Sequence, residues 1–266
     1  MTGLQRWESG GGYEAYVGRW SRLIAPLFIE WLDPAPDGRW LDIGFGTGAL
    51  TEAILDSAEP KTVHGIDPSE DFVSSTRSRI TDPRAEFSVA DAQDLPGDAG
   101  AYDYTVSGLV LNFVPDPTVA LAEMARVTRS GGCIAAYVWD YLGGMEMMNH
   151  FWDAANELDA EVASLDEGLR FPLCKPEPLR SLWEETGLGD VDVAPIEIDT
   201  NFRDFDDLWS PFLAGQGAAP TYAMSLDERA RDAVRELLRQ RLPVEPDGSI
   251  HLRARAWGVG GVVVGA

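Results

Sequence analysis

Lysine and histidine are scarce in this chain. Only two lysines, Lys61 and Lys175, and three histidines occur among 266 residues, whereas aspartate and glutamate together number 44, and the formal net charge is −23. Nucleic acids and anionic membranes both attract proteins through basic surfaces. The charge therefore argues against nucleic acid and against a membrane as partners, and it favours an uncharged or cationic ligand.

Cysteines and long apolar runs are also rare. Cys133 and Cys174 are the only cysteines, too few for a disulfide framework or a cysteine zinc site, and we expect no metal. The sequence has no run of about 18 apolar residues, and residues 1–8 lack the pattern of a signal peptide. We therefore expect a reduced, cytoplasmic protein, with monomer and homodimer both left open.

Short apolar runs alternate with amphipathic segments between residues 39 and 140. This alternation predicts β-α-β units and a parallel sheet. The predicted strands are 39–44, 62–66, 85–90, 102–108 and 133–139, and the predicted helices between them are 48–58, 68–80 and 117–128, the last one ended by Gly131 and Gly132.

The pattern becomes less regular after residue 140. Aromatic residues are frequent at 200–224, where we expect irregular structure, and Ser225 is the predicted cap of the charged helix that follows. The predicted helices of this half are 145–158, 177–186 and 225–242, and the predicted strands are 190–199 and 249–259.

The segment Arg-Trp-Leu-Asp-Ile-Gly-Phe-Gly-Thr-Gly at 39–48 is the most informative motif. The apolar run reaches Asp42, and glycines follow at alternate positions, Gly44, Gly46 and Gly48. A turn without side chains at the carboxyl end of a buried strand lets a ligand lie against the backbone. The next helix, which we expect to begin at about Ala49, directs its first amide groups toward that ligand.

Three further strand ends carry groups suited to an adenosine ligand. Asp67 follows the second strand and can accept hydrogen bonds from two ribose hydroxyls. Asp91 follows the third strand and can accept from the amine of adenine, with the amide of Ala92 facing the ring. Gly108 ends the fourth strand and can offer its carbonyl to an ammonium group. Ligands of open parallel sheets bind at this edge, so these groups are expected to act together.

These motifs resemble the class I S-adenosylmethionine-dependent methyltransferases, and within them the small-molecule branch that includes enzymes of ubiquinone and menaquinone biosynthesis. The resemblance covers about 40–140. It implies an α/β, Rossmann-like fold with a seven-stranded, mostly parallel sheet, an antiparallel last strand, helices on both faces and helical cap insertions. The segments that carry it are Leu-Asp-Ile-Gly-Phe-Gly-Thr-Gly (41–48), Gly-Ile-Asp-Pro-Ser (65–69), Ala-Asp-Ala-Gln-Asp-Leu-Pro (90–96) and residues 102–117.

The resemblance also implies a domain organisation. We interpret residues 1–266 as a single methyltransferase domain. Its predicted parts are an N-terminal helical lid (1–36), a cofactor-binding core (37–140), two cap insertions (141–175 and 200–248), and the last helix and strands (176–199 and 249–260).

The cofactor implied by the resemblance is S-adenosyl-L-methionine. The three glycines would border its methionine part, Asp67 its ribose, and Asp91 with Ala92 its adenine. Arg19 suits the cofactor carboxylate, because guanidinium–carboxylate hydrogen bonds are charge-assisted. Phe45 departs from the family, which more often has a small or polar residue there, and we expect its ring to point away from the ligand. The other predicted cofactor-binding residues are Tyr16, Asp42, Pro68, Ser69, Gly108 and Leu109.

Methyl transfer needs few catalytic groups from the protein, because the sulfonium already carries a good leaving group. The enzyme aligns the acceptor, excludes water and in some cases removes a proton. Asp140 and His150 are the candidate bases for a small organic acceptor. Aromatic side chains suit an apolar or aromatic acceptor, and the candidates for its pocket are Trp139, Tyr141, Trp152 and Trp209.

Two alternatives stay open at this point. The spacing Gly44-x-Gly46-x-x-Ala49, with Asp67 further on, also fits a loose dinucleotide fingerprint and hence an NAD-dependent oxidoreductase. No Tyr-x-x-x-Lys pair accompanies it, which argues against that chemistry. The second alternative is a protein that binds S-adenosylmethionine without catalysis.

Overall fold

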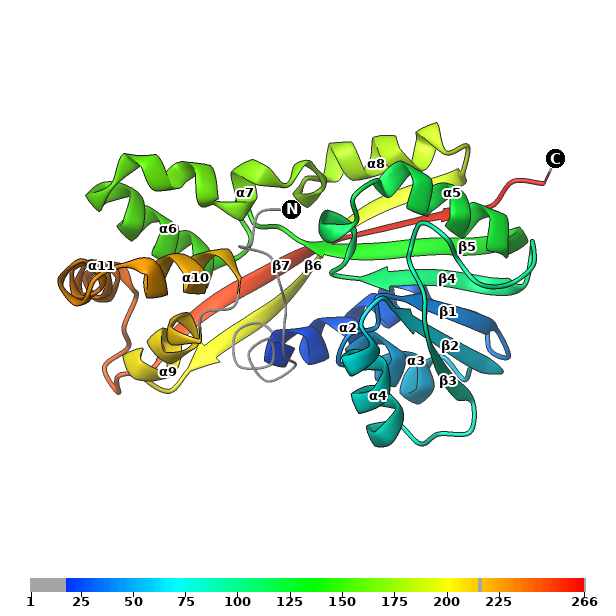
Figure 1. Cartoon of the computed structure of the whole chain (residues 1–266), viewed down its shortest axis with the longest axis horizontal. Helices are drawn as coiled ribbons and strands as arrows, with labels where there is room; N and C mark the ends of the chain where they lie inside the picture. The colour runs from blue at the N-terminus through cyan, green and yellow to red at the C-terminus, as the bar shows by residue number, and fades with distance from the viewer. Residues whose placement is uncertain (1–17, 215–216, 266) are drawn as a thin grey trace. The chain divides into compact units, whose positions relative to one another are not determined.

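The computed structural model describes residues 18–214 and 217–265, which form two compact units (Figure 1). The first, here called the sheet unit, comprises Ser21–Val138, Leu173–Ile196 and residues 256–265. The second, here called the aromatic unit, comprises Trp139–Pro172 and the described part of Glu197–Arg255, together with residues 18–20. The interpretation of the whole chain as one domain with a lid and cap insertions stays a prediction.

The strands form one seven-stranded sheet in the order β3-β2-β1-β4-β5-β7-β6. Strand β1 pairs in parallel with both β2 and β4, so the strand order reverses beside β1, where ligands of open sheets bind. Strand β7 is antiparallel to β5: Gly131 N–H donates to Val263 O over 2.8 Å, and Val263 N–H donates to Gly132 O over 2.9 Å. The predicted α/β fold class is confirmed. The strands are β1 (Arg39–Ile43), β2 (Thr62–Asp67), β3 (Ala85–Val89), β4 (Tyr102–Gly108), β5 (Thr128–Trp139), β6 (Gly189–Phe202) and β7 (Ile250–Val262).

Helices cover both faces of the sheet in the sheet unit. Successive side chains of a strand point to opposite faces. Ile134 of β5 belongs to a buried cluster with residues of α5 (Pro117–Val127) and α8 (Pro176–Glu185). Tyr137, three residues on, instead packs against Phe28 of α2 (Arg19–Leu32), with 4.7 Å between the ring centroids.

The helices that follow β1 and β2 position the predicted site. Helix α3 (Ala49–Ser57) begins directly after Gly48, as expected. Helix α4 (Glu70–Arg79) is capped by the Ser69 hydroxyl, which accepts from Phe72 N–H, and it carries acids in its first turn and arginines in its last. Both features stabilise a helix, the cap by accepting a free amide hydrogen and the charges through the helix dipole.

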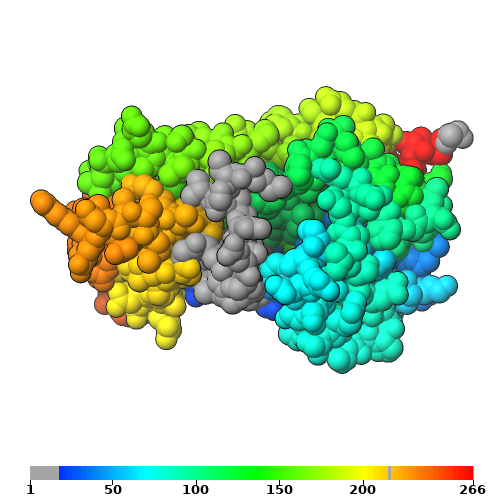
Figure 2. Space-filling model, viewed as in Figure 1, coloured from blue at the N-terminus to red at the C-terminus, as the bar shows by residue number. Residues whose placement is uncertain are grey.

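The aromatic unit is mostly helical. Its centre is the ring of Phe151 on α6 (Glu146–Leu158), which stacks on Phe212 with 4.5 Å between centroids and also contacts Trp152. Figure 2 shows α11 (Glu228–Arg241), coloured orange, at the surface, in keeping with its many charged residues. The remaining short helices are η4 (Ala160–Leu165), α7 (Glu167–Arg170), α9 (Phe205–Trp209), η6 (Ser210–Leu213) and α10 (Ala218–Ser225), with η3 (Leu111–Phe113) and η5 (Pro172–Cys174) in the sheet unit or at its boundary.

Three local predictions were wrong. The stretch 200–224 is largely helical, because its aromatic rings are buried against α6 and stabilise short helices of weak local propensity. Ser225 is the last residue of α10, and the cap of α11 is Asp227, whose Oδ1 accepts from Ala230 N–H over 2.7 Å. Helix α5 ends at Val127, before the two glycines, because Thr128 already has extended backbone.

Within the described ranges, no helix has both the length and the apolar character needed to cross a bilayer.

Candidate cofactor-binding site

The glycine turn after β1 leaves bare backbone next to open space. Gly44, Gly46 and Gly48 all have positive φ, at 70°, 52° and 79°. A Cβ on Gly44 would come within 2.6 Å of the Val110 side chain, and one on Gly48 within 2.8 Å of Ile80. Among the described residues, a Cβ on Gly46 would meet nothing nearer than a backbone oxygen at 3.9 Å. Two of the glycines are therefore required by packing, whereas Gly46 faces a space that a ligand can occupy.

The turn is held in place by its neighbours. Gly46 N–H donates to Asp67 Oδ2 over 3.0 Å, and the Thr76 hydroxyl of α4 donates to Gly46 O over 3.0 Å. Gly44 N–H donates to Ile66 O over 2.7 Å, and Arg79 donates to Thr47 O. The conformation of the Gly46 turn is thus held by hydrogen bonds within the protein.

Asp67 links the glycine turn to the start of α4. Its Oδ1 accepts from Ser69 N–H over 2.9 Å, across Pro68, while its Oδ2 accepts from Gly46. Burial raises the pKa of Asp67, and the two backbone hydrogen bonds oppose that rise. Each carboxylate oxygen has two lone pairs, so Asp67 can still accept hydrogen bonds from a diol. The structure brings Asp67, Ser69 and Gly46 together, and their binding of a cofactor stays a prediction.

Asp42 is the most deeply buried acid of this region, with 1% of its surface exposed. Its Oδ2 accepts from the Thr51 hydroxyl over 2.6 Å. Its Oδ1 is buried and has no hydrogen-bond partner among the described residues. Burial raises the pKa of Asp42 to about 7, the Thr51 hydrogen bond opposes this, and the charge of Asp67 adds to it.

The ends of β3 and β4 are also preformed turns. The exposed Asp91 uses Oδ1 to accept from Gln93 N–H of its own turn over 2.8 Å, next to a half-buried Ala92. A Cβ on Gly108 would lie 2.6 Å from the Tyr137 hydroxyl, so packing alone explains that glycine. Leu109 has φ of 64° and donates its N–H to Tyr137 O over 2.7 Å. A bulky residue in this left-handed conformation costs energy, as is common at functional sites.

Tyr16 and Arg19 are the cofactor-binding residues predicted in the N-terminal lid, and the structure describes only Arg19. Tyr16 lies outside the described residues. The Arg19 guanidinium lies 4.2 Å from the Trp20 ring and 4.8 Å from the Phe202 ring, and 3.6 Å from a carboxylate oxygen of Asp207. Burial lowers the pKa of Arg19, although Asp207 raises it. These partners all belong to the aromatic unit, and contact of Arg19 with a cofactor carboxylate stays a prediction.

Phe45 points into the protein interior, as expected. It is buried, and its ring packs against Phe87 of β3 with 4.9 Å between centroids. A Cβ on Gly65 would come within 2.9 Å of the Phe45 ring. The large residue inside the glycine motif is therefore accommodated by the missing side chain of Gly65.

Asp140, a candidate base, is held in an ion pair. Its Oδ2 accepts from Arg255 Nε over 2.9 Å and from a terminal nitrogen over 2.6 Å, and its Oδ1 accepts from Gly143 N–H over 3.1 Å. This geometry favours a structural role. His150 is half-buried on α6. A role as base stays a prediction for both residues.

The four aromatic residues predicted for an acceptor pocket are buried. Trp139, Tyr141, Trp152 and Trp209 expose between 2% and 8% of their surface. Trp152 donates its indole N–H to Glu167 Oε2 over 2.8 Å, and burial raises the pKa of Glu167 to about 7. Burial of this glutamate could not be foreseen, because the sequence gives it no pattern that differs from the exposed acids around it.

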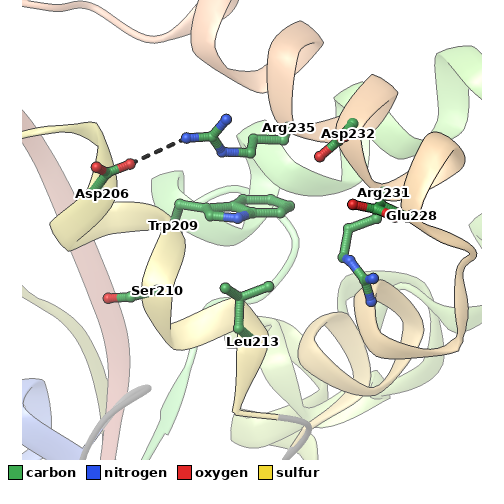
Figure 3. Close-up of a pocket in the computed structure, with 8 residues that line it drawn as sticks. All are labelled: Asp206, Trp209, Ser210, Leu213, Glu228, Arg231, Asp232 and Arg235. Carbon is green, nitrogen blue, oxygen red and sulfur yellow. Dashed lines mark hydrogen bonds and ion pairs between the residues drawn. The ribbon is translucent and has the colours of Figure 1, made fainter.

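One pocket of about 470 Å³ lies within the aromatic unit (Figure 3). Trp209 contributes to it from α9, and charged side chains of α11 face it, including Arg235, which pairs with Asp206 over 3.2 Å. In the sequence, the charged residues of α11 are typical of a solvent-exposed helix face, so the sequence did not predict that they line a pocket. The lining residues are Asp206, Trp209, Ser210, Leu213, Glu228, Arg231, Asp232 and Arg235.

The family match of this chain lies within the sheet unit. Residues 41–136 match the family described as "Methyltransferase domain". A demethylmenaquinone methyltransferase of Bacillus licheniformis is 31% identical over 169 residues, which is 58% of this chain and 72% of that protein. The chain belongs to the class I S-adenosylmethionine-dependent methyltransferases. The family and fold class predicted from the motifs are confirmed, and this match favours a methyltransferase over an NAD-dependent oxidoreductase.

Other matches are shorter or more distant. An uncharacterized 37.1 kDa protein in transposon TN4556 of Streptomyces fradiae is 34% identical over 114 residues, 42% of this methyltransferase chain. The chain covers 33% of that protein and 45% of an uncharacterized methyltransferase of Mycobacterium bovis. Among solved structures, Haemonchus contortus phosphoethanolamine N-methyltransferase 2 with S-adenosyl-L-methionine has a TM-score of 0.59 at 17% identity, over 97% of this chain and 58% of that one.

Proposed function

We propose that this methyltransferase transfers a methyl group from S-adenosyl-L-methionine to a small organic acceptor. The observation that carries the proposal is the open backbone at Gly46, hydrogen-bonded to Asp67 at the point where the strand order reverses. The buried, unpartnered Oδ1 of Asp42 fits the same ligand, because it offers an acceptor and a negative charge to a cationic molecule.

The chain's own residues have distinct tasks in this proposal. The glycine turn lets the methionine part lie against the backbone, Asp67 binds the ribose hydroxyls, and the Asp91–Ala92 turn binds adenine. When bound, the cofactor supplies a methyl group already activated by the sulfonium. The protein therefore has to align the acceptor and exclude water, and it needs a base only where the acceptor must lose a proton.

The acceptor class is supported by chemistry and by relatives. The net charge of −23 favours an uncharged or cationic acceptor. Relatives whose names state an activity include the demethylmenaquinone methyltransferase of Bacillus licheniformis and a ubiquinone biosynthesis O-methyltransferase of Thiobacillus denitrificans. We further propose a cytoplasmic location and a monomeric or homodimeric state, with neither nucleic acid nor membrane as partner.

Calorimetric titration of the purified chain tests the proposal. S-adenosylmethionine and S-adenosylhomocysteine are expected to bind with one molecule per chain, and NADH is expected to give no heat. Formation of S-adenosylhomocysteine in the presence of a small acceptor would then separate an enzyme from a protein that only binds the cofactor. Binding of NADH in place of the two adenosyl compounds would overturn the proposal.

A further inference from the structure

Asp42 is a buried carboxylate with no cationic partner among the described residues. Thr51 acts on it with both its hydroxyl, which donates to Oδ2, and its backbone N–H, whereas Oδ1 has no hydrogen-bond partner in the described part of the chain. An ionised carboxylate in such a place is costly unless a positive charge compensates it. No described residue supplies that charge, and a bound cationic ligand would therefore stabilise the ionised form of Asp42.

The elements packed around Asp42 bring it no compensating charge. In β2 and β4, the residues in register with it are Gly65 and Val106. The charged group that acts on it from β2 is another acid, Asp67. In α3, Glu52 follows Thr51, and its carboxylate is bound by Arg22 and Arg79. Those arginines therefore neutralise Glu52, and the described surroundings of Asp42 remain acidic.

The cofactor and its spent form differ by one positive charge close to this turn. S-adenosylmethionine carries a sulfonium, whereas S-adenosylhomocysteine carries an uncharged thioether. A buried, unpaired carboxylate beside the ligand is stabilised by the first and not by the second, and Coulomb interactions of this kind are strong where water is excluded.

We propose that Asp42 distinguishes the cofactor from its spent form by changing its protonation state. This inference rests on the proposed function. Binding of S-adenosylmethionine releases the Asp42 proton to solvent. After the methyl group has passed from the sulfonium to the acceptor, the ligand that remains is an uncharged thioether, and Asp42 takes a proton back from solvent. The site thus prefers the cofactor at alkaline pH and loses that preference as the pH falls.

The pKa of Asp42, raised to about 7 by burial, places the change in an accessible range. The ionised fraction of such a group falls from about nine-tenths at pH 8 to about one-tenth at pH 6. The affinity for the cationic cofactor is expected to be highest at pH values at which Asp42 is deprotonated, and to fall as Asp42 becomes protonated. The ratio of the dissociation constants of S-adenosylmethionine and S-adenosylhomocysteine is therefore expected to rise about tenfold between pH 8 and pH 6.

Calorimetry of the full chain and of Asp42→Asn measures that ratio. The ligands' own amino groups titrate identically in the two proteins, so any difference between their profiles belongs to Asp42. The wild type is expected to show the rise and Asp42→Asn a flatter profile. Titration at pH 7 in two buffers of different ionisation enthalpy counts the protons released on binding. Beyond the protons that the ligand itself exchanges, we expect about half a proton released per S-adenosylmethionine in the wild type and about none in the variant.

Thr51 offers an independent test if Asp42→Asn does not fold. Thr51→Val removes the donor that favours the ionised carboxylate and is expected to move the midpoint to higher pH, whereas Thr51→Ser keeps the donor and the midpoint. Parallel pH profiles for both ligands, or equal midpoints in the two Thr51 variants, would overturn the inference while leaving the proposed function intact. Failure of both adenosyl ligands to bind at every pH would instead overturn both.

Discussion

Each unit contains a buried aspartate, and the two are compensated in opposite ways. In the aromatic unit, Asp140 accepts two hydrogen bonds from Arg255, a residue 115 positions away, so its charge is neutralised within the protein. In the sheet unit, the described residues offer Asp42 hydrogen bonds from Thr51 alone and no cation, and a second acid, Asp67, acts on it. This difference is the basis of our proposal that the first acid serves the fold and the second serves a ligand.

The largest expected effect concerns the sheet unit. Asp67→Ala removes the acceptor for Gly46 N–H and for Ser69 N–H together with the proposed ribose contact, so we expect at least a roughly 100-fold loss of S-adenosylmethionine affinity by calorimetry at pH 8. Asp71→Ala, an equal change of charge at an exposed position of α4, is the matched control and is expected to bind normally. Equal affinities in the two variants would remove Asp67 from the site.

The ion pair of the aromatic unit gives the next effect. Arg255→Met leaves Asp140 buried without its partner, and we expect the free energy of unfolding in urea to fall by about 3 kcal/mol. Arg235→Met is the control, because Arg235 pairs with Asp206, whose side chain is 80% exposed, and such pairs contribute about 1 kcal/mol or less. Similar losses in the two variants would contradict a structural role for the Asp140–Arg255 pair.

Glu167 tests whether burial of an acid in the aromatic unit is compensated. Its pKa is about 7 in the folded chain, above the value of about 4.5 of an exposed glutamate, so the wild type loses stability as the pH rises between these values. Glu167→Gln keeps an acceptor for the Trp152 indole. We expect it to stabilise the chain by about 2 kcal/mol at pH 8 and by less than half of that at pH 5.

Urea unfolding of Glu167→Gln at the two pH values makes this measurement, and Glu161→Gln, at an exposed position of η4, is the control with no expected pH dependence. An effect of Glu167→Gln that is the same at both pH values would mean that Glu167 is already ionised and compensated in the fold.

The smallest effect separates packing from binding within the glycine motif. Phe45→Leu loses contact with Phe87, and we expect about 1 kcal/mol less stability but unchanged S-adenosylmethionine affinity within about twofold. Gly46→Ala places a methyl group in the open space and is expected to weaken binding clearly more than Phe45→Leu does. The opposite order would place the ligand against Phe45.

The sheet unit could be predicted from the sequence because its signals are local. Strand ends and helix caps lie within a few residues of one another, as with Asp67 and Ser69, so the motif and the geometry coincide. The aromatic unit could not, because its contacts join distant segments: Phe151 stacks on Phe212, and Glu146 accepts from Arg253 N–H. The predicted aromatic pocket residues proved to be buried for the same reason, since their partners lie in other segments.

The most direct measurement is a crystal structure of the full chain with S-adenosylhomocysteine. We expect both ribose hydroxyls within hydrogen-bonding distance of the Asp67 carboxylate and the amino-acid part of the ligand against the backbone of Gly46. A nucleoside bound away from Asp67, with the glycine turn contacting solvent only, would contradict this expectation.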